Sequence, residues 1–505
     1  MTVEPSAPIA VVGFGTMGAG IGHLAAGAGH QVLAYDALEG VVDRGIDAVR
    51  IRLDRSVEKG GLTVEEAHAI LNRITPCASL HDLAPAWLVI EAVVEDLDAK
   101  RSVFAQLEEI VGDDCILATN TSSLSVTSLA AGLRRPERIV GMHFFYPAPV
   151  MPLVEVVSGL TTSPEVADTA FRTAQAWDKT PVHTSSTPGF IVNRVARPFY
   201  GEALRLLAEG AADVATIDAV LREGGGFRMG PFELLDLIGI DVSLAVSESV
   251  YAASNFDPRF APSPIQQELV RAGRFGRKTG QGFYDHEPGI EAAHPQTVPP
   301  QARPQSLVAV GDLGIFEPMV DEAARAGIPI ERGRPSGTAH FIVDGIRLEL
   351  TCGVLATERA AALATDVVVF DLVLDYTGPG RMAVAVADQT GPGALESAAG
   401  LFQAIGKEVS AVDDAPGLIV MRTVAMLTNI GCDAVHQGVC NFAAVDTAMR
   451  LGTNYPRGPM EWGDLIGPTT LVTVLDNLAK AYGEDRYRVS PLLRRRALAS
   501  RSLLG

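Results

Sequence analysis

The chain has 505 residues, of which 47% are hydrophobic and 20% charged, and its formal net charge is −19. This length exceeds one hydrophobic core, so three or four domains are expected, and the composition is that of a globular protein. The acidic balance argues against nucleic acid as a partner and against binding to an anionic membrane surface.

The five cysteines are scattered without a Cys-x-x-Cys pair, which fits a reducing compartment and predicts neither disulfides nor a metal site. No run of 18 apolar residues suggests a membrane span. The first residues show no basic region followed by an apolar core, so no secretory signal is expected. The expected location is therefore the cytoplasm.

The chain begins with a pattern that is typical of dinucleotide binding. A short apolar strand at residues 9–12 runs into Gly-Phe-Gly-Thr-Met-Gly at residues 13–18, where glycines permit a tight turn and close approach to a pyrophosphate. A second strand ends at Asp36, where a carboxylate binds ribose hydroxyls and repels a 2′-phosphate, so NAD is expected. The expected cofactor contacts in this region are Gly13, Gly15, Thr16, Met17, Gly18 and Asp36.

Apolar strands at 87–91, 115–119 and 139–145 alternate with helical stretches, which predicts a doubly wound sheet. Glu95 and Ser122 follow the carboxyl ends of two of these strands, where such sheets bind ligands. An alternative for Ser122 is a simple helix cap before the next helix.

His143 is the candidate acid or base. The strands at 139–145 and 151–157 flank a proline-punctuated turn, and folding them together would bring Glu155 onto the His143 ring. A carboxylate there would fix the imidazole tautomer and stabilise the imidazolium, as removal of a proton from an alcohol requires. The alternative is a histidine buried in the core for structural reasons.

The helix after Asp36 carries Arg52, Arg55 and Lys59 at spacings of three and four, so the three lie on one face. This stripe is either a solvated surface or a site for the phosphates of an anionic carrier such as coenzyme A.

A helical region follows Pro188 and recurs later in the chain. Residues 188–194 match residues 416–422 at an offset of 228, and 17 of the 52 positions aligned from 188 to 239 are identical, which indicates a duplication. Asn193 becomes Met421 in the second copy, so we expect that copy to be architectural.

Between the two copies, a proline-rich linker precedes strand-like runs that alternate with helical stretches. No Gly-x-Gly-x-x-Gly follows a strand there, so no second NAD is expected. The predicted organisation is an α/β Rossmann domain at 1–186, an all-α domain at 187–286, a degenerate Rossmann-like α/β domain at 287–412 and a second all-α copy at 413–505.

Together these motifs resemble the 3-hydroxyacyl-CoA dehydrogenases, in the long bacterial form with a duplicated C-terminal domain. The resemblance rests on the fingerprint, Asn-Thr-Ser-Ser, His-Phe-Phe, Leu-Val-Glu, Pro-Gly-Phe-Ile-Val-Asn-Arg and Lys-Thr-Gly-Gln-Gly-Phe-Tyr. It implies NAD-dependent oxidation of an (S)-3-hydroxyacyl-CoA, of 3-hydroxybutyryl or 3-hydroxyadipyl type, to the 3-oxoacyl-CoA in fatty-acid or phenylacetate degradation.

The resemblance also implies roles for individual residues. His143 would be the general base and Glu155 its orienting carboxylate, while Ser122 and Asn193 would contact the reacting oxygen of the substrate. Ser122 would also lie beside the nicotinamide ribose. Tyr146 replaces a usual asparagine of the NAD site. The other implied contacts are Glu95, Lys100 and Lys278 for NAD and Lys59 for coenzyme A.

Arg197 lies four residues after Asn193, so both project from one helix face. Arg197 is either a solvated arginine or a ligand for the terminal carboxylate of a dicarboxylyl substrate such as 3-hydroxyadipyl-CoA. The second copy has Ala425 at the corresponding position.

Members of the family dimerise through the helical domain, so the second copy is expected to complete an intrachain pseudo-dimer, and a homo-oligomer is left open. Two rival functions remain at this point. A β-hydroxyacid dehydrogenase shares the glycine-rich opening but uses a catalytic lysine where this helix has Asn193. The second rival is a non-catalytic protein that binds NAD.

Overall fold

The computed structural model describes residues 7–334 and 337–505 and divides the chain into two compact units. The first unit contains the chain up to Arg194 together with Gln437–Thr453, and the second contains Val195–His436 and Asn454–Gly505. A short segment of the second helical copy thus packs with the N-terminal domain. Every helix in the described ranges is too short or too polar to cross a membrane.

The first unit is built on an eight-stranded sheet with the order β3-β2-β1-β4-β5-β6-β7-β8. All neighbouring strands are parallel except β6 and β7. The strands are β1 (Ile9–Val12), β2 (Val32–Tyr35), β3 (Ile74–Pro76), β4 (Leu88–Glu91), β5 (Ile116–Thr119), β6 (Ile139–Phe144), β7 (Leu153–Ser158) and β8 (Thr180–Ser185).

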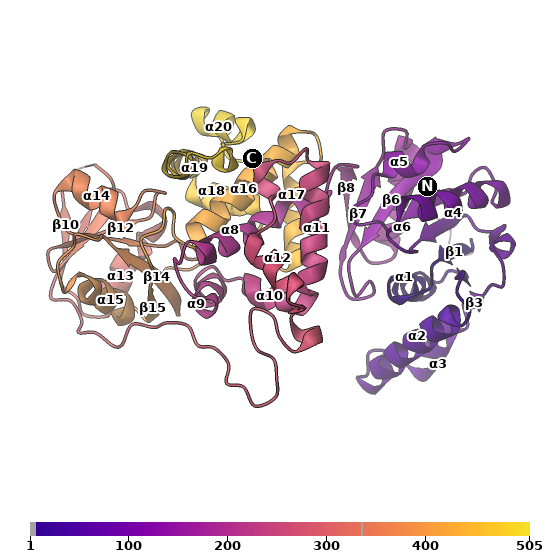
Figure 1. Cartoon of the computed structure of the whole chain (residues 1–505), viewed down its shortest axis with the longest axis horizontal. Coiled ribbons are helices and arrows are strands. Elements are labelled where there is room, and N and C mark those ends of the chain that lie inside the picture. The colour runs from indigo at the N-terminus through magenta and orange to yellow at the C-terminus, as the bar shows by residue number, and fades with distance from the viewer. Residues whose placement is uncertain (1–6, 335–336) are drawn as a thin grey trace. The chain divides into compact units, whose positions relative to one another are not determined.

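Helices cover both faces of this sheet (Figure 1), because its central strands are apolar on both sides. Ile9 and Val11 belong to one core with residues of α1, α2 and α6, while Ala10 and Val12 belong to a second core with residues of α4 and α5. The helices of the unit are α1 (Thr16–Gly27), α2 (Val41–Glu58), α3 (Val64–Leu71), η1 (Leu80–Leu83), α4 (Leu97–Ile110), α5 (Val126–Ala130), η2 (Pro136–Arg138), α6 (Pro164–Ala176), α7 (Val192–Val195) and α17 (Phe442–Thr453).

The second unit contains most of both helical copies. The first copy supplies α8 (Arg197–Ala208), α9 (Val214–Ala219), the π-helical turn η3 (Val220–Gly224), α10 (Pro231–Ile238), α11 (Ile240–Ala253), η4 (Pro258–Phe260), α12 (Pro264–Arg271) and η5 (Arg277–Thr279). The second copy supplies α16 (Val420–His436), α18 (Pro459–Ile466), α19 (Pro468–Tyr482), η7 (Asp485–Tyr487) and α20 (Pro491–Leu498).

The two copies are joined by a buried ionic cluster between α8 and the second copy. The Glu202 carboxylate is fully buried and accepts hydrogen bonds from Arg422 Nε at 2.9 Å and Arg486 Nη2 at 2.8 Å. Burial alone would raise the pKa of Glu202, but Arg486 and Arg422 hold this pKa at about 2. The copies therefore pack through a compensated buried charge as well as apolar surface.

The middle segment forms a seven-stranded mixed sheet in the second unit, with the order β10-β9-β11-β12-β13-β14-β15 (Figure 1). It confirms the expected α/β character. Its strands are β9 (Leu307–Val310), β10 (Ile330–Gly333), β11 (His340–Val343), β12 (Ile346–Leu350), β13 (Val367–Phe370), β14 (Gly380–Val386) and β15 (Lys407–Ala411). Its helices are η6 (Gly314–Phe316), α13 (Pro318–Arg325), α14 (Ala356–Leu363) and α15 (Ala394–Ala404).

Candidate active site

His143 and Glu155 meet across β6 and β7, as the sequence predicted. The antiparallel register places the two residues opposite each other, and His143 Nδ1 lies 2.6 Å from Glu155 Oε2. His143 is 6% exposed and Glu155 is fully buried. A short contact to a carboxylate makes Nδ1 the protonated nitrogen and leaves Nε2 as the hydrogen-bond acceptor.

The second carboxylate oxygen of Glu155 is held by backbone. Oε1 accepts hydrogen bonds from the N–H groups of Ile191 and Val192 at 2.9 and 3.0 Å. These groups are available because Gly189 and Phe190, at φ of +74° and +47°, turn the chain into α7. Sequence reasoning missed this contact, although the Pro-Gly turn before a helix was a usable signal.

The turn after β5 organises a second carboxylate, Glu95. Its Oε1 accepts hydrogen bonds from Thr121 Oγ1 at 2.6 Å and from the Ser122 N–H at 3.1 Å. Burial would raise the pKa of Glu95, but the hydrogen bond from Thr121 and the charge of Lys100 keep this pKa below its ordinary value. The carboxylate therefore fixes the Ser122 turn in its ionised form.

Ser122 and Asn193 are brought together, with Asn193 Nδ2 3.5 Å from the Ser122 carbonyl oxygen. Asn120, which precedes this turn, accepts the Phe144 N–H at 2.9 Å and so ties it to the residue after His143. The rings of Phe145 and Phe190 lie 4.5 and 5.8 Å from that of His143. Amide, hydroxyl and imidazole groups are thus held by one local network with an apolar border.

The glycine-rich turn fits a bound pyrophosphate. A Cβ on Gly13 would lie 2.6 Å from the Ala92 oxygen, and one on Gly18 would lie 1.8 Å from the Gly13 oxygen. Gly15 faces open space, and α1 begins there without a side-chain cap. Free N–H groups at a helix start bind phosphate oxygens. Thr16 and Met17 form the first turn of α1.

Asp36 lies at the end of β2 and accepts hydrogen bonds from the N–H groups of Phe14 and Leu38 at 2.9 and 3.0 Å. Lys100 is different from the other predicted NAD contacts, because its side chain is 1% exposed and its Nζ pairs with Glu91 at 2.6 Å and Glu95 at 3.3 Å. We interpret Lys100 as the counter-charge that positions Glu95. Tyr146, another residue predicted at the NAD site, is 67% exposed, and its contact with NAD stays a prediction.

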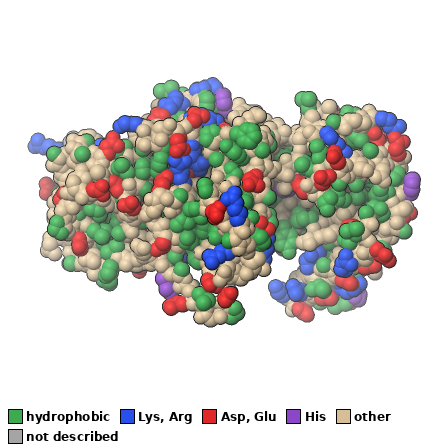
Figure 2. Space-filling model, viewed as in Figure 1, with side chains coloured by type: hydrophobic (Ala, Val, Ile, Leu, Met, Phe, Trp, Pro, Cys, Tyr) green, Lys and Arg blue, Asp and Glu red, His purple; other side chains and the backbone are tan. Residues whose placement is uncertain are grey.

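The basic stripe on α2 is only partly solvated. Arg55 and Lys59 are exposed, whereas Nε and Nη2 of Arg52 are buried and have no hydrogen-bond partner within residues 7–334 and 337–505. Burial and the neighbouring Arg52 lower the pKa of His23 to about 4. Basic and acidic side chains intermingle over α2 and α3 in Figure 2. Arg52 therefore retains donors for an anion.

The remaining predicted residues, Lys278 and Arg197, lie in the second unit. Lys278 belongs to η5, and its Nζ pairs with Asp241 at 2.6 Å, so its contact with NAD stays a prediction. Arg197 begins α8 and is 9% exposed; it is therefore not the solvated arginine of the simpler alternative. Residues 7–334 and 337–505 contain no group of three His, Cys, Asp or Glu placed to hold a metal ion.

A doubly wound sheet with a glycine-rich turn that fits a pyrophosphate, in one unit with a carboxylate-held histidine, is typical of the dinucleotide-binding oxidoreductases, and comparison with known proteins specifies the family. The NAD-binding domain of 3-hydroxyacyl-CoA dehydrogenase matches residues 8–187, and the C-terminal domain of the same family matches 189–286 and again 417–502. A reduced Rossmann-fold domain of 3-hydroxybutyryl-CoA dehydrogenase matches 348–416.

Individual proteins agree with these matches. A 3-hydroxyadipyl-CoA dehydrogenase of Escherichia coli is 45% identical over 491 residues, which are 97% of each chain. A 3-hydroxybutyryl-CoA dehydrogenase of Clostridioides difficile is 41% identical over 55% of this chain and 99% of its own. The crystal structure of an E. coli 3-hydroxybutyryl-CoA dehydrogenase superposes with a TM-score of 0.89 at 43% identity, covering 98% of both chains. The chain belongs to the 3-hydroxyacyl-CoA dehydrogenase family.

Proposed function

We propose that the chain catalyses the reversible, NAD-dependent oxidation of an (S)-3-hydroxyacyl-CoA thioester to the 3-oxoacyl-CoA. The observation that carries this proposal is the contact of 2.6 Å between His143 and Glu155 in a unit that also presents a phosphate-binding turn. The names of the relatives span 3-hydroxybutyryl and 3-hydroxyadipyl thioesters.

The residues present fit NAD. The first turn of α1 would hold the pyrophosphate, and Asp36 the adenosine ribose, while Glu95 and Ser122 would border the nicotinamide half. The bound nicotinamide supplies the acceptor for the hydride that leaves C3 of the substrate.

His143 handles the proton. With Nδ1–H donated to Glu155, the Nε2 lone pair accepts the proton of the substrate 3-hydroxyl as the C3 hydride departs. The resulting imidazolium is stabilised by the carboxylate of Glu155, whose other oxygen is held by two backbone N–H groups. In the reverse direction the imidazolium returns this proton to the developing alkoxide.

Ser122 and Asn193 stabilise the reacting oxygen. Each side chain has a donor, and the contact from Asn193 Nδ2 to the backbone carbonyl oxygen of Ser122 keeps the two residues together. Donors that are fixed before the reaction stabilise an alkoxide more effectively than water, which must reorient. Arg52 and Lys59 would bind coenzyme A phosphates, and the unpartnered nitrogens of Arg52 support this part of the proposal.

The second half supports the site without duplicating it. The strands β13 and β14 are antiparallel like β6 and β7, but at the offset of the repeat the positions of His143 and Glu155 are taken by Asp371 and Ala383. With Met421 in the place of Asn193, the second copy has neither the histidine nor the amide of the first.

The test is NADH oxidation by the wild-type chain with acetoacetyl-CoA, beside His143→Gln. We expect wild-type turnover and a loss on the order of 10²–10⁴ in rate for the variant, as for other general bases. His81→Gln, at an exposed histidine on η1, is the matched control and should retain wild-type rates. Near-normal turnover by His143→Gln contradicts the assignment, and inactivity of the wild type favours the non-catalytic alternative.

A further inference from the structure

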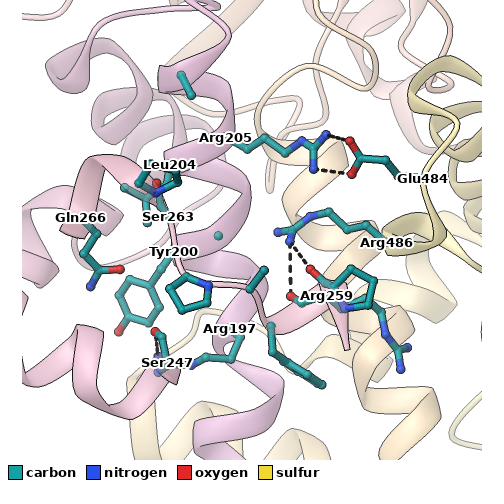
Figure 3. A pocket seen from close by; sticks show the side chains of 17 residues that line it. Arg197, Tyr200, Leu204, Arg205, Ser247, Arg259, Ser263, Gln266, Glu484 and Arg486 are labelled. Atoms are coloured by element: carbon teal, nitrogen blue, oxygen red, sulfur yellow. Dashed lines mark hydrogen bonds and ion pairs between the residues drawn. The ribbon is translucent and has the colours of Figure 1, made fainter. Parts of the chain in front are cut away.

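A pocket of about 270 Å³ lies wholly within the second unit, along one face of α8 (Figure 3). Arg197, Tyr200, Leu204 and Arg205 line it at helical spacing, and α11, η4, the start of α12 and the region of η7 supply the other walls. Apart from its arginines, much of the lining is aliphatic, aromatic or proline. The pocket suits a small ligand with an apolar body.

Three of the four arginines that line this pocket are neutralised by acids. The ion pairs have nitrogen–oxygen distances of 2.6 to 2.8 Å where Arg205 meets Glu484, Arg259 meets Asp257 and Arg486 meets Glu202. In Figure 3 the Arg205 and Glu484 side chains face each other through two parallel hydrogen bonds. These three guanidinium groups are therefore occupied by the protein itself.

Arg197 is the exception. Its Nη1 donates to Ser247 Oγ at 3.1 Å, its Nε is buried without a hydrogen-bond partner, and no carboxylate of the described residues forms an ion pair with it. The guanidinium lies 5.1 Å from the centre of the Tyr200 ring, which offsets part of its burial. Burial lowers the pKa of Arg197. An unpaired buried cation is costly, so it marks a place for an anion.

The scaffold itself does not need an arginine here. The second helical copy has Ala425 at the matching position of α16, and this alanine is fully buried. The same helix thus packs without a cation in its other context, so the repeat by itself does not account for Arg197.

We propose that this pocket binds a carboxylate at the end of a short aliphatic chain, and that Arg197 with Ser247 recognises it. The planar guanidinium matches a carboxylate, and the apolar lining accepts the methylene groups. A dicarboxylyl thioester, a choice that rests on the proposed function, and a separate small dicarboxylate both carry such a carboxylate, and the experiment distinguishes the two.

The experiment compares the wild type with Arg197→Met on 3-oxoadipyl-CoA and acetoacetyl-CoA, and measures adipate binding by calorimetry. We expect Arg197→Met to lower kcat/KM for 3-oxoadipyl-CoA by about 10- to 100-fold, the usual range for a charge-assisted hydrogen bond. The value for acetoacetyl-CoA, which has no second carboxylate, should change by less than about threefold. Arg271→Met, an exposed arginine on α12, is the control for general charge effects.

The two sources of carboxylate give different results. A loss of kcat/KM that is confined to 3-oxoadipyl-CoA identifies the thioester substrate as the source of the carboxylate. If Arg197→Met instead abolishes adipate binding and leaves the ratio of kcat/KM for the two thioesters unchanged, the source is a separate ligand. Equal effects on both thioesters with no adipate binding to the wild type overturn the proposal. If Arg197→Met does not fold, Arg197→Lys and Ser247→Ala carry the same comparison. A wild type inactive on acetoacetyl-CoA refutes the proposed function. The proposal of a carboxylate pocket is then still decided by whether adipate binds.

Discussion

Glu155→Gln separates the two tasks of one buried carboxylate. Its Oε1 accepts hydrogen bonds from two backbone N–H groups, and its Oε2 forms a hydrogen bond with His143 Nδ1. A glutamine has one oxygen and one NH₂ group, so only one of these places keeps an acceptor. Reversing the amide would leave two buried N–H donors unsatisfied, at about 1–3 kcal/mol each. The oxygen should therefore face the backbone, and the NH₂ group should face His143.

This orientation removes the base. Nδ1 must accept from the NH₂ group, so the proton moves to Nε2, the nitrogen that takes the substrate proton in the proposed reaction. The wrong tautomer and the lost imidazolium partner together should reduce kcat by about 10²–10⁴, or roughly 3–5.5 kcal/mol of barrier. KM should change little, because Glu155 is fully buried.

The assay is the initial rate of NADH oxidation over a range of acetoacetyl-CoA concentrations, with urea unfolding as the check on folding. Glu165→Gln, at an exposed glutamate at the start of α6, is the control. A folded Glu155→Gln protein with kcat within about threefold of the wild type would refute the reasoning, because the tautomer would then be irrelevant to turnover.

Further predictions concern the cofactor, the helical copies and α17. Asp36→Ala should raise KM for NADH about tenfold and weaken its preference over NADPH, and steady-state rates with both cofactors test this. Glu202→Gln should lower the unfolding free energy by about 3–5 kcal/mol in urea at neutral pH. The folded pKa of Glu202 is about 2, below its ordinary 4.5, so its stabilisation is present above pH 4.5 and is lost as the pH falls towards 2. If the unfolding free energy of the variant stays equally far below that of the wild type at low pH, the prediction is contradicted. Gly452→Val should slow turnover, because a Cβ there would lie 2.7 Å from Leu153 and 3.0 Å from Val192 beside the Glu155 site; unchanged kcat rejects this. A fragment ending at residue 286 lacks α17 and should be poorly soluble or dimeric, and a well-behaved monomer in sedimentation counts against this.

The sequence predicted those parts of the site that depend on local pattern. The glycine-rich turn follows a strand, and the proline-punctuated turn between two apolar strands indicated that Glu155 would lie against His143. Contacts made by backbone groups, such as the Ile191 N–H on Glu155, have no side-chain signature. The packing of 437–453 with the first unit could not be predicted, because it joins segments about 250 residues apart. That Arg197 has no acid partner among the described residues likewise emerges only in the folded structure.

The duplicated half retains one of the two tasks that Glu155 combines. Asp371 follows β13 and accepts the N–H groups of residues 419–421 at 2.7 to 2.9 Å, and residues 419–420 match 191–192 in the repeat. In both copies a buried carboxylate therefore accepts backbone N–H groups at the start of a helix, which is the short α7 in the first copy and the long α16 in the second. Burial raises the pKa of Asp371 to about 6, and no imidazole or guanidinium contacts this carboxylate in the described ranges, whereas the carboxylate of Glu155 also orients a histidine. The common element is thus a buried carboxylate that binds the backbone at the start of a helix, although the two carboxylates stand at different places in the repeat: Glu155 lies on β7, whereas Asp371 lies at the position that corresponds to His143.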